Sequence, residues 1–411
     1  MALTDEQLEL FGGQLAALYQ DFERAVIGDI ARRLAKTGRL TETAELMAET
    51  LREQGWSPAR IYTQVMRALS ANEYWEKEIA ANTLAIKQKV RQGIDALNAQ
   101  AGKAAREIAK ETGVLAFRTD LEAWKMDRLP IRDSAFERLV EAMRKDLTGE
   151  LLNLTKTTAF RLNTGDIVPT GQIYARELNN ALVKVSSGAY SYGKAIGEAV
   201  NELAKSGIRT VDYAKGAAWQ LDTAVRNAVM AASAQLAGRI TMHNVEQTGV
   251  EHVEVSSHLG ARTGEGHANH AGWQGQVYRV QGSDAQYRNL EEATGYPTDP
   301  AGLCGYNCRH TLYPFWPGVS ERIPAEPEPA PVEYNGRRYT YYQATQEQRR
   351  REREIRALKR EANARKDAGL DDKQLRARIK AKTVEYDEFS GAVGIRAKNE
   401  RLRVGNMVRF S

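Results

Sequence analysis

Residues 258–278 read HLGARTGEGHANHAGWQGQVY, and residues 302–318 read GLCGYNCRHTLYPFWPG. All six histidines of the chain lie between His243 and His310, and both cysteines, Cys304 and Cys308, lie in the same window. Elsewhere the chain is mostly Ala, Leu, Glu, Lys and Arg, which favour helices, whereas Gly, Trp, His and Asn favour turns, stacking and coordination. The change in composition predicts a compact, loop-rich module.

Three short strands are expected in and around this module. After Gly249 the residues of 250–257 alternate in polarity, and Val253 and Val255 supply an apolar side. Residues 276–280 and 311–315 have the composition of two further strands. The module is therefore expected to be α+β, with short antiparallel strands around residues 250–316 packed on a helix.

The rest of the chain predicts helices, so the fold class is mainly α. Residues 4–37 carry apolar residues every three or four positions, Thr4 and Gln7 suit a capping box, and Gly38 suits a stop. Residues 72–112 form a longer helix with a narrower apolar stripe, which suggests an arm that needs a partner. Further helices are expected at residues 46–55, at 58–69 after a Ser57 cap, at 135–162 after Pro130 and a Ser134 cap, at 173–203 and at 211–249, with a loop at 163–170.

Beyond the module the composition changes again. The segment IPAEPEPAPVE is a stiff, extended linker, and Asn335-Gly336 predicts a hairpin. A highly charged helix is expected over residues 346–382, followed by a tail with enough apolar residues to dock on another surface. The resulting domains are 1–165 (helical arm and assembly region), 166–320 (helices plus the His/Cys/Trp-rich module), 321–333 (linker) and 334–411 (hairpin, basic helix and tail).

Length and charge limit the classes of protein that fit. A chain of 411 residues suits two or three domains, and its net charge of +5 permits contact with nucleic acid or an acidic surface without requiring it. Two cysteines cannot form a disulfide framework. The acidic beginning of the chain is unlike a signal peptide, and no apolar run is long enough to span a membrane. We expect a protein made in the cytosol, with no membrane contact.

A metal site is the sharpest chemical hypothesis for the module. Cys304, Cys308 and His310 offer two thiolates and an imidazole, and His267 and His270 could complete a tetrahedron around a structural Zn²⁺. In the alternative interpretation both cysteines are small buried hydrophobic residues and the histidines bond the backbone of irregular loops. The sequence leaves both open.

Enzymatic alternatives fit less well. A zinc deaminase needs Glu two residues after its first His and then P-C-x2-C, and neither is present. Cys308, His310 and Asn307 have the residue types of a thiol protease, but neighbours in an extended segment point to opposite faces, so we expect them to stay apart. A nuclease could use His267, Asn269, His270 and His310. No P-loop or dinucleotide-binding motif occurs in the sequence.

The basic helix from Arg349 to Lys382 offers a second hypothesis, contact with DNA phosphates. The alternative is a solvated helix with Glu–Arg pairs four residues apart, and Glu352, Glu354 and Glu361 suit that arrangement.

The two quoted stretches resemble the phage minor capsid protein 2 family, a relative of the Mu F-type head morphogenesis proteins encoded beside the portal gene of tailed phages. The similarity extends to LDTAVRNAV (221–229) and TQEQRRREREIR (345–356), and covers residues 210–380, about half of the chain. The residues that match the family motif, which we interpret as scaffolding that fastens two loops together, are Arg262, His270, Trp273, Gly275, Gly302, Asn307, Cys308, Arg309 and His310.

The resemblance implies a structural, non-catalytic virion component. Such a protein would be assembled in the host cytoplasm, bind the portal protein in the procapsid and aid head morphogenesis, inside the capsid near the portal. Further copies of itself and packaged DNA are the other expected partners. The alternative function is a metal-dependent nuclease or toxin-like enzyme that uses the His/Cys module.

Overall fold

The computed structural model describes residues 5–38, 42–125, 131–187, 190–212 and 216–405. The protein is mainly α, with short antiparallel strands, as the sequence indicated. Within the described ranges the helices longer than one turn are α1 (Asp5–Gly38), α2 (Glu42–Glu53), α3 (Pro58–Ser70), α4 (Glu73–Trp124), α5 (Asp133–Lys156), α6 (Ile173–Ser186), α7 (Tyr192–Ser206), α8 (Leu221–Thr248), α9 (Leu290–Thr294), α10 (Tyr341–Asp367) and α11 (Lys373–Ala392). None of them is long and apolar enough to cross a membrane.

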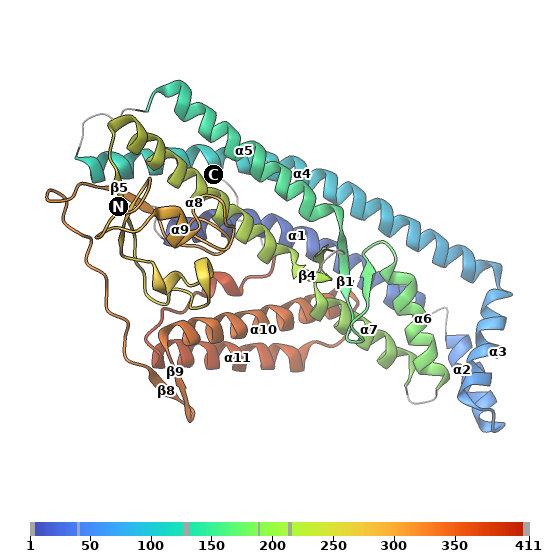
Figure 1. Ribbon diagram of the computed structural model, residues 1–411. Helices are drawn as coiled ribbons and strands as arrows, with labels where there is room; N and C mark the ends of the chain where they lie inside the picture. The colour runs from blue at the N-terminus through green and yellow to red at the C-terminus, as the bar shows by residue number, and fades with distance from the viewer. Residues whose placement is uncertain (1–4, 39–41, 126–130, 188–189, 213–215, 406–411) are drawn as a thin grey trace.

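Helix α4 runs along most of the molecule and packs against α1, α5 and α8 (Figure 1). Its buried positions include Ile86, Leu97 and Ile108 together with several alanines, whose small side chains let the neighbouring helices approach closely. The expectation of an arm that needs another chain to cover its apolar stripe was wrong, because helices of the same chain cover it. The helix also continues to Trp124, beyond the expected end at residue 112.

A four-stranded antiparallel sheet, which the sequence did not predict, lies between α5 and α8. Its order is β2-β1-β3-β4, and its strands are β1 (Thr158–Arg161), β2 (Ile167–Pro169), β3 (Arg209–Asp212) and β4 (Ala217–Gln220). Strands of three or four residues are too short to show a period of two. The sequence therefore predicts a helix over the residues of β1 and a loop over those of β2, and the helix expected from Val211 begins at Leu221.

Other helix boundaries also differ from expectation. The helix predicted over 173–203 is two helices, α6 and α7, and Ser191 caps the second by accepting a bond from the Lys194 backbone N–H. Ser57 precedes α3 as expected but forms no side-chain cap, and α5 is preceded by Arg132, not capped by Ser134. The predicted cap at Thr4 and break at Pro130 lie outside the described residues.

The expected three-stranded sheet of the module is confirmed. Strand β5 (His252–Val255) lies between β6 (Val277–Arg279) and β7 (Leu312–Phe315), and both pairings are antiparallel. The module lies at the end of the molecule opposite to α2 and α3 (Figure 1). An edge contact between Trp124 and Trp316, with ring centroids 5.3 Å apart, attaches it to the end of α4.

The C-terminal region is a helical hairpin with a small β-hairpin at its base. The predicted turn at Asn335-Gly336 joins β8 (Val332–Tyr334) to β9 (Arg337–Tyr339). The single charged helix predicted over 346–382 is instead α10 and α11, which pair across a turn at Gly369. Phe389 of α11 is fully buried against the rings of Tyr334 and Tyr339.

One hydrophobic cluster contains residues from both 1–165 and 166–320 and also Ala364 of α10, and two smaller clusters lie within 334–411. The segment 321–331 is exposed and forms no regular element, which suits its composition. The domain boundaries themselves stay predictions.

Candidate functional site

Arg262 contacts two irregular loops of the module. Its Nε donates to the Ala268 carbonyl at 3.1 Å, and one terminal nitrogen donates to the Ala301 carbonyl at 2.6 Å. The same nitrogen lies 2.7 Å from Nε2 of His270. A planar guanidinium can bond several acceptors at once. Arg262 therefore connects His270 to Ala301, which are 31 positions apart in the chain.

Trp273 packs beside two of the histidines of the module. Its side chain is buried, and its indole N–H donates to the His267 carbonyl at 3.0 Å. The ring lies 4.5 Å from that of His270 and 4.7 Å from that of His310, measured between centroids. Tyr278 of β6 donates to the Trp273 carbonyl at 2.7 Å, so the aromatic group is fixed to the sheet.

The glycines of the motif permit these close approaches. Gly275 has φ +64°, a conformation that side chains rarely adopt. At Gly302 a Cβ atom would collide with the Thr294 carbonyl oxygen, so the loop can pass α9 only without a side chain there.

Cys308 and His310 do meet, contrary to the expectation that they stay apart. Sγ of Cys308 lies 3.5 Å from Nδ1 of His310, because residues two apart in an extended segment share a face. Nε2 of His310 lies 2.9 Å from Oε1 of Gln274, which also accepts the His258 backbone N–H. The Gln274 oxygen requires a proton on Nε2, so Nδ1 is left to accept the thiol proton.

Burial makes this pair chemically inert in the described fold. Cys308 and His310 are both fully buried. Burial raises the pKa of the Cys308 thiol to about 11 and holds the pKa of His310 well below its usual range. A neutral, inaccessible thiol is a poor nucleophile, so the arrangement does not support a thiol protease.

Three of the five candidate metal ligands lie together. One donor atom each from His270, Cys308 and His310 lies within 4.8 Å of the other two. His267 is outside this group, since its Nδ1 bonds the Asp299 carboxylate at 2.8 Å, and Cys304 directs its thiol to the His310 carbonyl at 3.9 Å.

The chemistry around the three donors fits a metal ion poorly. Burial lowers the pKa of His270 to about 4, and the positive Arg262 beside it contributes to the shift. A guanidinium in contact with a ligand histidine repels a cation. Each of the three side chains already has a hydrogen-bond partner, so packing and hydrogen bonding account for the cluster, and the zinc site stays a hypothesis.

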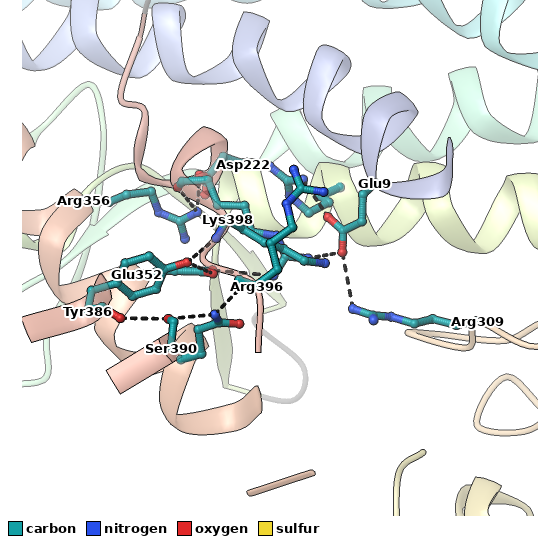
Figure 2. Close-up of polar contacts among 12 residues, drawn as sticks. Glu9, Asp222, Arg309, Glu352, Arg356, Tyr386, Ser390, Arg396 and Lys398 are labelled. Atoms are coloured by element: carbon teal, nitrogen blue, oxygen red, sulfur yellow. Dashed lines mark hydrogen bonds and ion pairs between the residues drawn. The ribbon is translucent and has the colours of Figure 1, made fainter. Parts of the chain in front are cut away.

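Arg309 leaves the module and reaches the first helix. It donates to Oε1 of Glu9 at 3.3 Å, and Arg226 of α8 lies 3.2 Å from the other oxygen of that carboxylate. Arg401, in the segment after α11, also pairs with the Glu9 carboxylate that Arg309 contacts in Figure 2. Burial alone would raise the pKa of Glu9, but the surrounding cations, Arg401 and Arg226 foremost, hold it at about 2.

The network continues into the C-terminal hairpin. Arg401 lies 3.5 Å from Glu352 of α10, whose carboxylate also accepts the hydroxyl of Tyr386 at 3.2 Å. The Tyr386 oxygen in turn accepts the Lys398 backbone N–H at 2.7 Å (Figure 2). Gln348 of α10 donates to both the Ser390 hydroxyl and the Arg396 carbonyl. The chain after α11 is thereby fastened along α10.

The buried stripe of α10 is polar, which corrects the expectation of a solvated helix. Gln348, Glu352, Arg356 and Arg360 recur every four residues and are all buried. Arg360 donates to the Ala204 carbonyl at the end of α7. Glu–Arg pairs of the expected spacing do occur on the more exposed side, such as Arg350 with Glu354 at 3.6 Å.

Arg309 is predictable as a motif residue, whereas the sequence does not mark Glu9, Arg226 or Arg401 as its partners. Glu9 occupies one position of an amphipathic helix, where a carboxylate is ordinary. The available signal was Arg226 beside the apolar face of its helix, which indicated a buried cation without indicating its partner.

Comparisons with known proteins identify a phage structural protein. The chain is 28% identical over 158 residues to a protein of Lactococcus phage LL-H named "Structural protein", which covers 37% of this chain and 41% of that relative. The family model described as phage minor capsid protein 2 matches residues 3–389. The chain therefore belongs to the phage minor capsid protein 2 family, and the resemblance found in the sequence is confirmed and extends to the N-terminal helices. No solved structure matches the chain.

Proposed function

We propose that this phage capsid-associated protein is a non-catalytic component that binds the portal and supports head assembly from inside the capsid. The observation that carries the proposal is that the module's reactive side chains are buried and bonded internally: Cys308 and His310 are inaccessible, and Arg262 and Trp273 hold two loops together. In this proposal the module has a structural role, and the hydrogen bond from Arg309 to Glu9 attaches it to α1.

The portal contact in this proposal is made by the α2–α3 surface, which we define as Leu46, Trp56 and Tyr74. These three large side chains are 65%, 40% and 60% exposed. They belong to α2, the turn before α3 and the start of α4, at the end of the molecule away from the module (Figure 1). Exposed aromatic and aliphatic side chains of this size favour protein contacts.

Co-expression with the portal protein of the same phage, followed by affinity capture, tests the proposal. We expect wild-type protein to capture the portal and the double variant Leu46→Ser, Trp56→Ser to lose it. Val319→Ser is the matched control, because Val319 is 82% exposed and does not belong to the α2–α3 surface. Capture of further copies of this chain without the portal would identify self-association instead, and would contradict the portal assignment.

The catalytic alternative is tested with the same protein. Incubation with supercoiled plasmid and Mg²⁺, Mn²⁺ or Zn²⁺ is expected to leave the DNA intact. Cleavage that the single change His310→Ala abolished while the protein stayed folded would support the nuclease hypothesis and would overturn the non-catalytic role.

A further inference from the structure

Two adjoining cavities lie where the module, α8, α10 and the C-terminal segment meet. The larger has a volume of about 550 Å³, and both are lined by Asn307, Arg309, Gln346, Arg349 and Arg401. This size suits a small ligand, and it is too small to admit a nucleic-acid duplex. We refer to the two together as the arginine cavity.

Positive charge exceeds negative charge in this cavity. The smaller cavity, with a volume of about 160 Å³, is lined by six arginines and by the two carboxylates of Glu9 and Glu352. Glu9 is already shared by three of these arginines, and Glu352 pairs with one of the same three. Both carboxylates of the smaller cavity are therefore already paired with arginines.

Arg349 and Arg353 are the residues left over. They lie four residues apart on α10, and both line the cavity. Within the described part of the chain neither forms a hydrogen bond, or an ion pair within 4 Å. A third cavity residue on the same helix, Arg356, has a buried Nε atom without a hydrogen-bond partner.

Arg349 is partly buried, and an uncompensated guanidinium in such a place is costly unless an anion joins it. Arg353 is exposed, so its guanidinium stays hydrated and free to bond an anion that enters from solvent. Burial lowers the pKa of Arg349 to about 10, and the nearby charges of Arg309 and Arg401 add to the shift. The planar guanidinium forms paired hydrogen bonds with phosphate oxygens, and several guanidinium groups together match several phosphates.

We propose that the arginine cavity binds a small anion with two or more phosphate groups, held mainly by Arg349 and Arg353. Such a ligand would bridge α10 to Arg309 of the module and Arg226 of α8. The negative charge of the ligand would offset the positive charge of the arginines that Glu9 and Glu352 do not neutralise. The proposal does not depend on portal binding, because the cavity does not include the α2–α3 surface.

Calorimetric titration of the full chain with inorganic tripolyphosphate tests the proposal at constant ionic strength. We expect one binding site, and a rise in Tm at saturating ligand. Arg349→Gln and Arg353→Gln should each weaken binding roughly tenfold or more, as expected for loss of a hydrogen bond between charged groups. Arg338→Gln is the control, because Arg338 is an exposed arginine of β9 outside the cavity.

The same titration distinguishes the sources of the phosphate. Competition by a short single-stranded DNA with a 5′-phosphate, and none by its 5′-hydroxyl counterpart, would support the site and assign the phosphates to a DNA end. No competition by either DNA would support a free oligophosphate. Absence of tripolyphosphate binding, or binding that Arg349→Gln leaves unchanged in a protein with wild-type circular dichroism, would overturn the proposal.

Discussion

Arg309 donates a hydrogen bond to Glu9 at 3.3 Å, although the two residues are 300 positions apart in the chain. Arg309 belongs to the Asn-Cys-Arg-His motif of the module, and Glu9 belongs to the first helix. The contact makes the module, α1, α8 and the C-terminal segment parts of one polar junction (Figure 2). Of the two motif arginines, Arg309 therefore connects the module to other regions of the chain, whereas Arg262 connects two loops within the module.

We expect Glu9→Gln to destabilise the protein by about 3 kcal/mol at pH 7, because it leaves Arg226, Arg309 and Arg401 without their shared counter-charge. Urea denaturation followed by circular dichroism measures the change. Glu49→Gln, an exposed position of α2, is the control and should change stability by less than about 0.5 kcal/mol. Equal stability of Glu9→Gln and wild type would show that the ion pairs of Glu9 contribute nothing to the free energy of unfolding.

The stability difference between wild type and Glu9→Gln should depend on pH. The pKa of Glu9 is about 2 in the folded state against 4.5 as the ordinary value, so its contribution is fully present above about 4.5. That contribution is lost as the pH falls from 4.5 toward 2. The stability difference between wild type and Glu9→Gln should therefore shrink over this range, and a difference that stayed constant would contradict the lowered pKa.

Glu177 of α6 should have the opposite pH dependence. Burial raises its pKa to about 7, and Glu202 adds to the shift while Asn180, Lys184 and Arg176 oppose it. Because the pKa of Glu177 is raised in the folded state, its contribution to the stability of the fold is fully present below pH 4.5. That contribution is lost as the pH rises through about 7.

We therefore expect Glu177→Gln to be more stable than wild type at pH 8.5, by roughly 2 to 3 kcal/mol, with the advantage vanishing near pH 4.5. Thermal unfolding across this pH series measures the effect. Glu137→Gln, an exposed substitution on α5, should not change the pH profile. Lower stability of Glu177→Gln at pH 8.5 would contradict the raised pKa, because it would show that the folded protein stabilises the ionised carboxylate.

Trp273→Ala should destabilise the protein by about 3 to 5 kcal/mol, because it removes a buried ring and leaves the His267 carbonyl without its donor. Trp219→Ala is the matched control, since Trp219 is 55% exposed, and its effect should stay within about 0.5 kcal/mol. Chemical denaturation compares the two, and similar losses for both would remove Trp273 from its role in the module.

Metal content tests the hydrogen-bonded interpretation of His270, Cys308 and His310. We expect the purified protein to keep its Tm after treatment with a chelator, because these side chains have hydrogen-bond partners and Arg262 lies beside them. Stoichiometric zinc and a chelator-induced fall in Tm would instead establish a metal centre. His267→Ala would then retain the ion, since His267 bonds Asp299, whereas His310→Ala would lose it.

The sequence by itself determined the mainly helical class, the three strands of the module and the hairpin at Asn335-Gly336. It did so because each depends on local signals: apolar residues at helical spacing, alternation around Val253 and Val255, and a turn dipeptide with a strong conformational preference. The family could likewise be recognised from the motif residues, which stand close together in the chain.

Only the tertiary structure decided which distant segments of the chain pack against one another. The sheet of β1 to β4 joins residues more than 50 positions apart through strands of only three or four residues, too short to show a period. The inner stripe of α10 is built from Gln348, Glu352, Arg356 and Arg360, and such residues are buried only where partners from distant segments neutralise them. The Glu9 junction depends on the same condition: a charge's partner is chosen by the packed fold, and no local pattern in the sequence records that choice.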